Sequence, residues 1–394
     1  MKDNLDKLIE KYLDDIIEIR RDIHMHPEIG MEEIRTSGIV KSELEKLGLE
    51  VQDKIGNMGV VGLLRGREPG KTILLRADMD ALPIEEQTDL PFKSTVSGKM
   101  HACGHDVHTS ILLGAAKVLS ELKDEIKGNI KFVFQPAEEA NPTGGARYMI
   151  EDGVLENPKV DAAMALHVWG FPLGKVALRT GTMMAQSDRI FITVKGKAAH
   201  ASQPHNGVDA IIAAGHILTA LQTVISRNVD PMESAVVTIG TIHGGNRYNV
   251  LCDKVVMEGT VRIFNPAVAE LMPNRIKAIA ENVAKALDCE CDFEYVPGYK
   301  MTVNNEELAN KAIQSFQDVL GEENVLIPEH PASGSEDFSE FTMRVPSVFY
   351  WLGIESDLNE GRTTLHNPNL IVDERSIPIG IKTMCKAALD FLNE

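Results

Sequence analysis

The sequence has no pattern that would predict a disulfide framework, a membrane-spanning run or a secretion signal. Its five cysteines are an odd number scattered along the chain (Cys103, Cys252, Cys289, Cys291 and Cys385), which predicts a reducing compartment. No uninterrupted apolar segment reaches the roughly 18 residues that a membrane-spanning helix needs. The chain does not begin with a basic stretch followed by an apolar run, as a signal peptide would. We therefore expect a cytoplasmic protein that has no membrane partner.

The sequence also lacks a surplus of positive charge. Its 40 Lys and Arg residues are outnumbered by 58 Asp and Glu residues, so the formal net charge is −18. Nucleic-acid binding needs a surplus of cations to neutralise phosphates, so we expect no nucleic-acid partner. What remains is ordinary globular composition, 43% apolar and 25% charged, in 394 residues. This length fits two domains of common size.

Short apolar runs alternate with helical patterns in the first 186 residues. The runs at 60–64, 72–75, 129–134 and 162–168 predict strands that are buried on both faces. Helices are expected from about residue 5 to 21–24 and at 32–47, 111–122 and 144–150. This alternation predicts an α/β fold with a largely parallel or mixed sheet covered by helices.

A different pattern begins near Ser187. Strand, helix, strand, strand, helix and strand are expected in turn at 190–194, 207–225, 234–242, 254–263, 268–287 and 289–295. This order is the split βαβ pattern of a ferredoxin-like α+β domain. After about residue 304 the first pattern returns, with a helix through 316, a strand at 348–352 and a helix at 377–392. We therefore expect a discontinuous metal-binding domain, residues 1–186 and 299–394, with an inserted domain at 187–298.

The stretch 100–109 carries the densest chemistry. It holds one thiol, three imidazoles and a carboxylate within ten residues. Gly104 stands between Cys103 and His105 and lets the backbone bend so that both side chains can point at one centre. Such a concentration of soft and borderline ligands suggests a metal site. The alternative is a polar loop with ordinary surface histidines.

Three further candidate ligands come from other segments, namely Glu139, His167 and His366. With Cys103 and His105 they form a mixed set of S, N and O donors, which suits zinc, manganese, cobalt or nickel in a catalytic role. Five candidates are too many for one tetrahedral ion. We therefore expect two divalent metal ions per subunit.

Four carboxylates near the expected strand ends are further candidates for the metal site. Glu138 and Glu139 repel each other, which is easier to explain if a cation neutralises one of them. Glu138 can then act as general base toward metal-activated water; alternatively, the pair belongs to a solvated acidic loop. Asp78 and Asp80 follow a buried strand, where α/β sheets usually place ligands. Turn formation ahead of Pro83 would equally explain them.

The inserted domain holds candidates for substrate contact. His200 lies in a loop after a strand and could reach a substrate oxyanion across a dimer interface. Asn249 and Arg262 could bind carboxylate or carbonyl oxygens, since a guanidinium can grip a carboxylate through two hydrogen bonds. The alternative for His200 is an ordinary surface loop.

Taken together, these segments resemble the M20 metallopeptidase family. The resemblance is closer to its amidohydrolase branch, which includes aminoacylases, hippurate hydrolases and auxin-conjugate hydrolases. The matching stretches are 26–30, 76–83, 100–106, 134–139, 199–202, 334–338 and 365–368.

The resemblance implies a two-metal catalytic domain, an inserted ferredoxin-like lid that mediates dimerisation, and hydrolysis of an N-acyl-L-amino acid. The ligands it implies are Cys103, His105, Glu139, His167 and His366. By the same likeness Glu138 is the base, Asp80 orients a ligand histidine and Asp78 is its companion. His200 supports the oxyanion, and Gly334 joins Asn249 and Arg262 in substrate binding. A homodimer or higher homo-oligomer is expected.

The sequence departs from the family in one loop. Cys252 stands where relatives commonly carry proline, and the bulky Arg247 and Tyr248 lie beside Asn249, so the substrate-recognition surface differs. The expected function is hydrolysis of N-acyl amino acids to a carboxylate and a free amino acid. One alternative is a dipeptidase or carboxypeptidase, which a preference for a free amino terminus would reveal. Another is a catalytically silent metal- or amino-acid-binding protein, although binding alone does not need Glu138 beside a ligand carboxylate.

Overall fold

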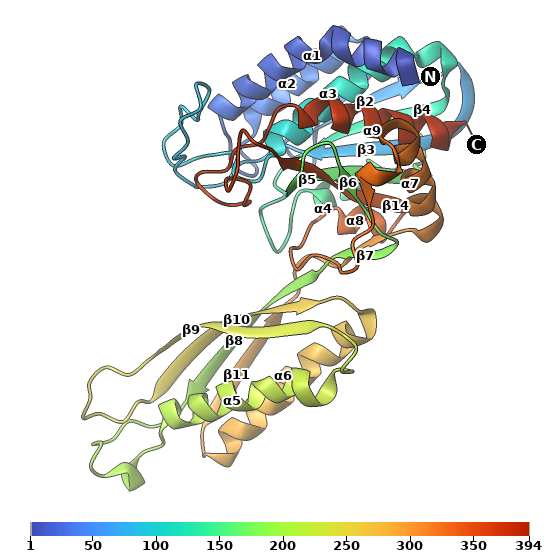
Figure 1. Ribbon diagram of the computed structural model, residues 1–394. Helices are drawn as coiled ribbons and strands as arrows, with labels where there is room; N and C mark the ends of the chain where they lie inside the picture. The colour runs from blue at the N-terminus through green and yellow to red at the C-terminus, as the bar shows by residue number, and fades with distance from the viewer. Residues whose placement is uncertain (1, 394) are drawn as a thin grey trace. The chain divides into compact units, whose positions relative to one another are not determined.

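The computed structural model describes residues 2–393, and the chain divides into two compact units (Figure 1). The second unit comprises Met184–Met301 and Pro331–Glu336. The first unit comprises the residues up to Met183, Thr302–His330 and the residues from Asp337 onward. The first unit is therefore discontinuous in sequence.

Within the described residues, the first unit is built on an eight-stranded mixed sheet in the order β1-β2-β4-β3-β5-β14-β6-β13. Its centre, β4-β3-β5-β14, is parallel, and β1 and β2 add antiparallel strands at one edge. The strands are β1 (Glu50–Ile55), β2 (Gly59–Arg65), β3 (Glu68–Asp78), β4 (Lys127–Gln135), β5 (Ala162–Pro172), β6 (Val176–Ala177), β13 (Val325–Leu326) and β14 (Ser347–Glu355). Because four neighbouring strands are parallel, their carboxyl ends meet at one edge of the sheet.

Helices pack against this sheet around one hydrophobic core. Alternate residues of β3, namely Ile73, Leu75 and Ala77, belong to the core that α1, α3 and α9 share. The opposite face of β3 carries Arg76 and Asp78, which are also fully buried. The helices are α1 (Lys2–Met25), α2 (Ile34–Lys46), α3 (His105–Glu121), α4 (Ala146–Glu151), α7 (Glu306–Leu320), α8 (Ser339–Thr342) and α9 (Ser376–Leu392).

The predicted α/β class with a mixed sheet is confirmed, but some elements differ from those expected. The helix expected from residue 111 begins at His105, because Gly104 adopts a left-handed conformation (φ 84°) that ends the preceding loop there. The strand β1 was missed. Its side chains are mostly exposed, so it carries no apolar run.

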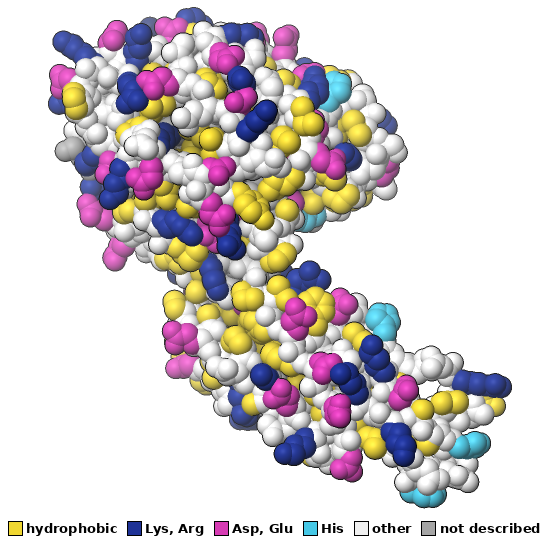
Figure 2. Space-filling view, turned by 180° about the vertical axis from the view of Figure 1, so that it is seen from behind, with side chains coloured by type: hydrophobic (Ala, Val, Ile, Leu, Met, Phe, Trp, Pro, Cys, Tyr) yellow, Lys and Arg dark blue, Asp and Glu magenta, His cyan; other side chains and the backbone are white. Residues whose placement is uncertain are grey.

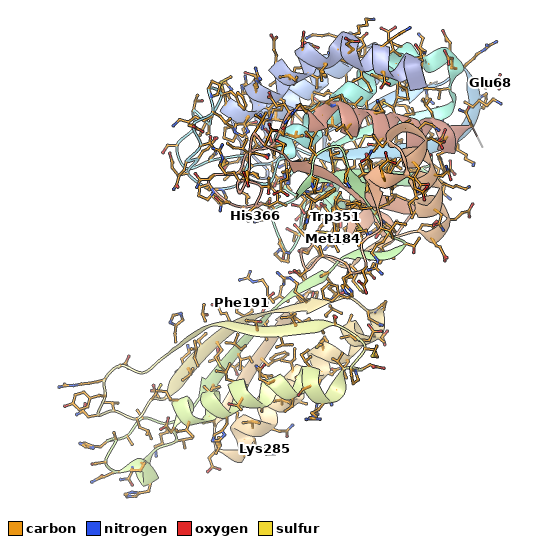
Figure 3. All side chains as sticks on the ribbon, in the orientation of Figure 1. Glu68, Met184, Phe191, Lys285, Trp351 and His366 are labelled. Carbon is orange, nitrogen blue, oxygen red and sulfur yellow. The ribbon has the colours of Figure 1, made fainter. Side chains whose placement is uncertain are left out.

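The second unit has a four-stranded antiparallel sheet in the order β11-β8-β10-β9. In sequence, β8 (Gln186–Lys195), α5 (Ala210–Asn228), β9 (Ala235–Gly244), β10 (Lys254–Ile263), α6 (Pro266–Ala286) and β11 (Glu290–Val296) follow the expected split βαβ order. Ile190, Ile192 and Val194 of β8 face the core shared with α5 and α6. Phe191 points to the opposite face of the sheet (Figure 3).

Helix α5 is long and apolar enough, by length and composition, to cross a membrane. Its apolar side chains include Ile217, Leu221 and Val224, which are buried against the sheet and α6. They therefore belong to the core of the second unit.

The surface carries mixed charge, with acidic and basic side chains interspersed over the face shown in Figure 2. All five cysteines are free. Their odd number and scattered positions in the sequence had predicted no disulfide framework.

Candidate metal centre

The candidate ligands converge at the carboxyl edge of the parallel strands. Asp78 ends β3, Glu138 and Glu139 follow β4, and His366 follows β14. His167 lies within β5, which continues to Pro172 rather than ending near Val168 as predicted. However, the pairing of β5 with β3 stops at Ala165. His167 therefore lies beyond the last residue of β5 that pairs with β3.

Cys103 and His167 form the buried end of the site. The Cys103 Sγ atom lies 3.3 Å from Nε2 of His167. The other ring nitrogen, Nδ1, lies 2.7 Å from the Val168 carbonyl oxygen and donates its proton there. This hydrogen bond fixes the tautomer, so that Nε2 keeps its lone pair for a metal.

His105 is oriented by Asp80. Its Nδ1 lies 3.1 Å from Oδ1 of Asp80, and the other oxygen of Asp80 accepts a hydrogen bond of 2.9 Å from the Glu139 N–H. One carboxylate therefore ties the first residue of α3 to the loop after β4. These are the contacts that a residue orienting a ligand histidine needs.

Glu139 and His366 form the more open end. Nε2 of His366 lies 3.0 Å from Oε1 of Glu139, and the His366 side chain is 53% exposed (Figure 3). The backbone of His366 is in the left-handed region (φ 60°), and its N–H donates to the Ala102 carbonyl at 2.7 Å. The loop after β14 is thus tied to the residue next to Cys103. His366 is the most exposed of the five candidate ligands.

Several groups of these side chains could hold an ion. In each group the possible ligand atoms lie within 4.8 Å of one another. The groups are Cys103, His105 and His167; Cys103, Glu139 and His366; His105, Glu138 and Glu139; and Asp78, His105 and His108. The first two share only Cys103, which leaves enough separate donors for two ions.

The electrostatics of the site depend on buried charge. Burial lowers the pKa of His105, but the charges of Asp78 and Asp80 outweigh it and raise that pKa to about 10. Burial also raises the pKa of the Cys103 thiol well above its usual value, and Glu139 and Glu138 raise it further. A divalent cation would reverse both effects, because it favours a thiolate and a neutral imidazole.

One buried nitrogen without a hydrogen-bond partner in residues 2–393 indicates that the candidate ligands fit a metal ion. Nε2 of His105 is fully buried and has no hydrogen-bond partner among the described residues. A buried polar atom without a partner is costly, and a cation would satisfy it. With the S, N and O donors around it, this atom fits divalent metal binding.

Three residues that the sequence interpretation missed support the site. His108 contacts Oδ1 of Asp78 through Nδ1 at 2.6 Å and accepts a hydrogen bond of 2.9 Å from the Val168 N–H through Nε2. The fully buried Arg76 pairs with Asp78 at 2.7 Å and with Asp337 at 2.8 Å. Despite burial, His105, His108 and Arg76 hold the pKa of Asp78 well below its usual value. The position of His108, three residues after His105 on a helix, could have revealed its role. Arg76 and Asp337 lie in the matching stretches 76–83 and 334–338, but the sequence interpretation assigns no role to either.

Two tryptophans lie against the buried end. The Trp169 ring is 5.9 Å from the His167 ring, and Trp169 stacks on Trp351 with ring centroids 4.9 Å apart. Trp351 is the register partner of His167 in the parallel pair of β14 and β5. Aromatic surface therefore covers one side of His167.

The remaining predicted residues belong to the second unit, where they form two separate pairs. Ala201, next to His200, donates its N–H to the Asn249 carbonyl at 3.2 Å, and Nδ1 of His200 accepts from the Ser202 N–H at 3.1 Å. Arg262 donates to the Ser333 carbonyl at 3.1 Å, which places it beside Gly334.

The two pairs lie at opposite ends of β10. Arg262 is near the end of the strand, whereas the loops of His200 and Asn249 adjoin its beginning at Lys254. The eight residue steps from Lys254 to Arg262 span about 27 Å of strand. Most of the length of β10 therefore lies between the pair of His200 and Asn249 and the pair of Arg262 and Gly334.

Comparison with known proteins identifies the family to which these residues and this fold are similar. Residues 74–390 match the peptidase family M20/M25/M40. N-acetyl-L-cysteine deacetylase of Bacillus subtilis is 40% identical over 363 residues, which cover 92% of this chain and 84% of the relative. Thermostable carboxypeptidase 1 of Saccharolobus solfataricus is 38% identical over 397 residues, which cover 98% of this chain and all of the relative. The crystal structure of the Bacillus subtilis YXEP protein, described as a dinuclear metal binding peptidase, has a TM-score of 0.85 and 33% identity and covers 98% of this chain and 99% of that one.

Proposed function

The chain belongs to the peptidase family M20/M25/M40, and on that premise we propose that it hydrolyses N-acyl-L-amino acids to a carboxylate and a free amino acid. The observation that carries the proposal is the group formed by His105, Glu138 and Glu139, whose possible ligand atoms lie within 4.8 Å of one another. Glu138 is 6% exposed, so a carboxylate stands beside the ligand set in a nearly dry environment. A site that only binds metal does not need this second carboxylate.

The proposed ligands are Cys103, His105, Glu139, His167 and His366, and the proposed cofactor is a pair of zinc, manganese, cobalt or nickel ions. When bound, such ions supply Lewis acidity that polarises an amide carbonyl and lowers the pKa of water. The chain provides the orientation. Asp80 holds Nδ1 of His105, and the Val168 carbonyl holds Nδ1 of His167, so both rings keep a fixed direction.

Glu138 is the proposed general base. It accepts a proton from the attacking water as the new C–O bond forms at the acyl carbon. It then gives that proton to the amide nitrogen as the C–N bond breaks, so the amine leaves as a neutral group. Proton transfer of this kind contributes about 10²- to 10⁴-fold to rate.

The second unit is proposed to contribute substrate contacts. His200 would support the oxyanion, and Asn249, Arg262 and Gly334 would bind the carboxylate or carbonyl oxygens of the substrate. The separation of the two pairs along β10 supports a homodimer in which His200 serves the site of the other subunit. Gel filtration with light scattering tests this, and a monomer would contradict it.

A carboxypeptidase is the second candidate, favoured by the similarity to the thermostable carboxypeptidase 1 of Saccharolobus solfataricus. Both reactions break an amide next to an amino acid with a free carboxylate. They differ in whether the acyl side is a simple acyl group or a peptide.

A substrate panel separates the two. Protein stripped with a chelator is resupplied with zinc, manganese, cobalt or nickel and assayed for amino-acid release from N-acetyl amino acids, N-benzoyl amino acids and dipeptides. Metal-restored release from the N-acyl compounds is the expected result. Release from dipeptides alone would favour the carboxypeptidase, and no release with any metal would contradict both.

A further inference from the structure

Glu33 stands at the N-terminus of helix α2, yet its side chain does not serve that helix. It occupies the N-cap position but makes no hydrogen bond to the N–H groups of the first turn. Those groups are bound by Glu28, whose two carboxylate oxygens accept from the N–H groups of Arg35 and Thr36 at 2.9 Å each. A short side chain at an N-cap, such as that of Asp, normally makes these hydrogen bonds itself. Glu33 is therefore available for another role.

The carboxyl group of Glu33 reaches the loop after β4 instead. Its Oε1 accepts a hydrogen bond of 2.7 Å from the Ala137 N–H, across 104 residues of sequence. Ala137 is fully buried and lies directly before Glu138, the proposed base. Its φ of 54° is in the left-handed region, which is strained for a residue with a Cβ. Strain of this kind persists only where the surroundings fix the backbone.

Two carboxyl groups thus hold the backbone on both sides of Glu138. Glu33 binds the N–H of the preceding residue, and Asp80 binds the N–H of Glu139 at 2.9 Å. The segment that carries Glu33 also packs tightly here, since a Cβ added at Gly30 would lie 3.1 Å from Cα and Cβ of Ala137. The direction of the Glu138 side chain follows from this clamped backbone.

Holding Glu33 in this place is costly. Its side chain is fully buried, and its second oxygen, Oε2, has no hydrogen-bond partner among the described residues. Burial, and then the charge of Asp80, raise the pKa of Glu33 to about 8. A buried carboxyl group with one unsatisfied oxygen destabilises a fold. Such exceptions to local rules are expected near functional sites.

We propose that Glu33 is a positioning residue, which holds Ala137 in its left-handed conformation and so aims Glu138 at the reacting centre. The proposal rests on the proposed function for its effect on rate. The contact itself can be tested in metal-free protein. Glu33 touches neither substrate nor metal in this account, and it acts only through the backbone of residues 137–139.

Three variants test the role. Glu33→Met keeps the length of the side chain but removes the acceptor, Glu33→Gln keeps an acceptor oxygen, and Glu28→Ala removes the cap of α2 without touching the loop. Hydrogen exchange of the Ala137 amide, measured without metal, is expected to accelerate in Glu33→Met and to stay slow in Glu33→Gln and Glu28→Ala. In the metal-loaded protein, kcat of Glu33→Met is expected to fall about 10- to 100-fold, as for other residues that orient a site. KM should be unchanged, and Glu33→Gln should recover most of the lost rate.

The outcomes are separable. If Glu33→Met keeps both slow Ala137 exchange and wild-type kcat, the proposal is wrong. If Glu28→Ala lowers kcat as much as Glu33→Met, Glu33 is merely structural. Wild-type protein that is inactive with every metal would refute the proposed function, while the exchange measurement still decides the contact. Should Glu33→Met not fold, Glu33→Met/Ala137→Gly replaces it, because glycine adopts the left-handed conformation without strain. Its kcat should then lie below that of Ala137→Gly alone, and equal values would contradict the proposal.

Discussion

Replacing Gly104 by alanine should damage the metal centre through its backbone and not through its ligands. Gly104 lies between Cys103 and His105 with a φ of 84°. A Cβ at this position would lie 2.5 Å from Cγ2 of Val168, well inside van der Waals contact. The substitution therefore combines a strained conformation with a steric clash.

The expected cost follows from these two terms. A left-handed conformation costs about 1–2 kcal/mol for a residue with a Cβ. Overpacking in a dense core costs about 1–3 kcal/mol. Together they predict a loss of about 2–5 kcal/mol in the free energy of unfolding. Metal affinity should fall as well, because Val168 binds both His108 and His167 through its backbone.

Denaturant unfolding of the metal-free protein measures this cost, and a double-mutant cycle separates its two terms. Val168→Ala removes the clashing methyl group but leaves the backbone strain. The cycle with Gly104→Ala should show a favourable coupling of about 1–3 kcal/mol, the size of the overpacking term. An unfolding free energy for Gly104→Ala equal to that of the wild type would refute the reasoning. A coupling energy near zero between Gly104→Ala and Val168→Ala would show that the added Cβ does not clash with Val168.

Two further predictions concern charges outside the candidate ligand set. Arg20 is buried and pairs with the buried Asp106 at 2.8 Å, so Arg20→Met should cost about 3–5 kcal/mol in the free energy of unfolding, because Asp106 loses its guanidinium partner and keeps only the contact with His24. Arg21→Met is the matched control, because the exposed Arg21 pairs with a different carboxylate, Glu374. It should cost about 0–1 kcal/mol in the free energy of unfolding. Equal losses in Arg20→Met and Arg21→Met would contradict the account. Burial lowers the pKa of Lys131 from 10.5 to about 8, so the unfolded chain binds more protons between these values. Relative to Lys131→Met, the wild type should therefore gain stability as pH rises from about 8 to 10.5, and a constant difference in unfolding free energy across this range would contradict the shift.

The sequence predicted those parts of the structure that depend on local pattern. Short apolar runs identified the central strands, and the polar residues after them placed Asp78, Glu138 and Glu139 near the ends of strands. The strand β1 has no such run because it is mostly exposed. The start of α3 was missed because the left-handed Gly104, and not a side-chain cap, precedes it.

Long-range partners could not be predicted in the same way. Arg76 and Asp337 are 261 residues apart, and Glu33 and Ala137 are 104 apart. Nothing in the local sequence around Asp337 or Ala137 indicates these contacts, which arise only when the sheet brings strand ends together. Similarly, the separation of His200 from Arg262 along β10 depends on the register between β8 and β10.

The central claim is that Glu138 is the base at a two-metal site, and Glu138→Gln tests it most directly. Metal content per chain and kcat on an N-acyl amino acid are measured side by side for this variant and the wild type. The account predicts two divalent ions per chain in both proteins and a fall in kcat of about 10²- to 10⁴-fold in the variant. A variant that keeps its metal and turns over at the wild-type rate would contradict the claim.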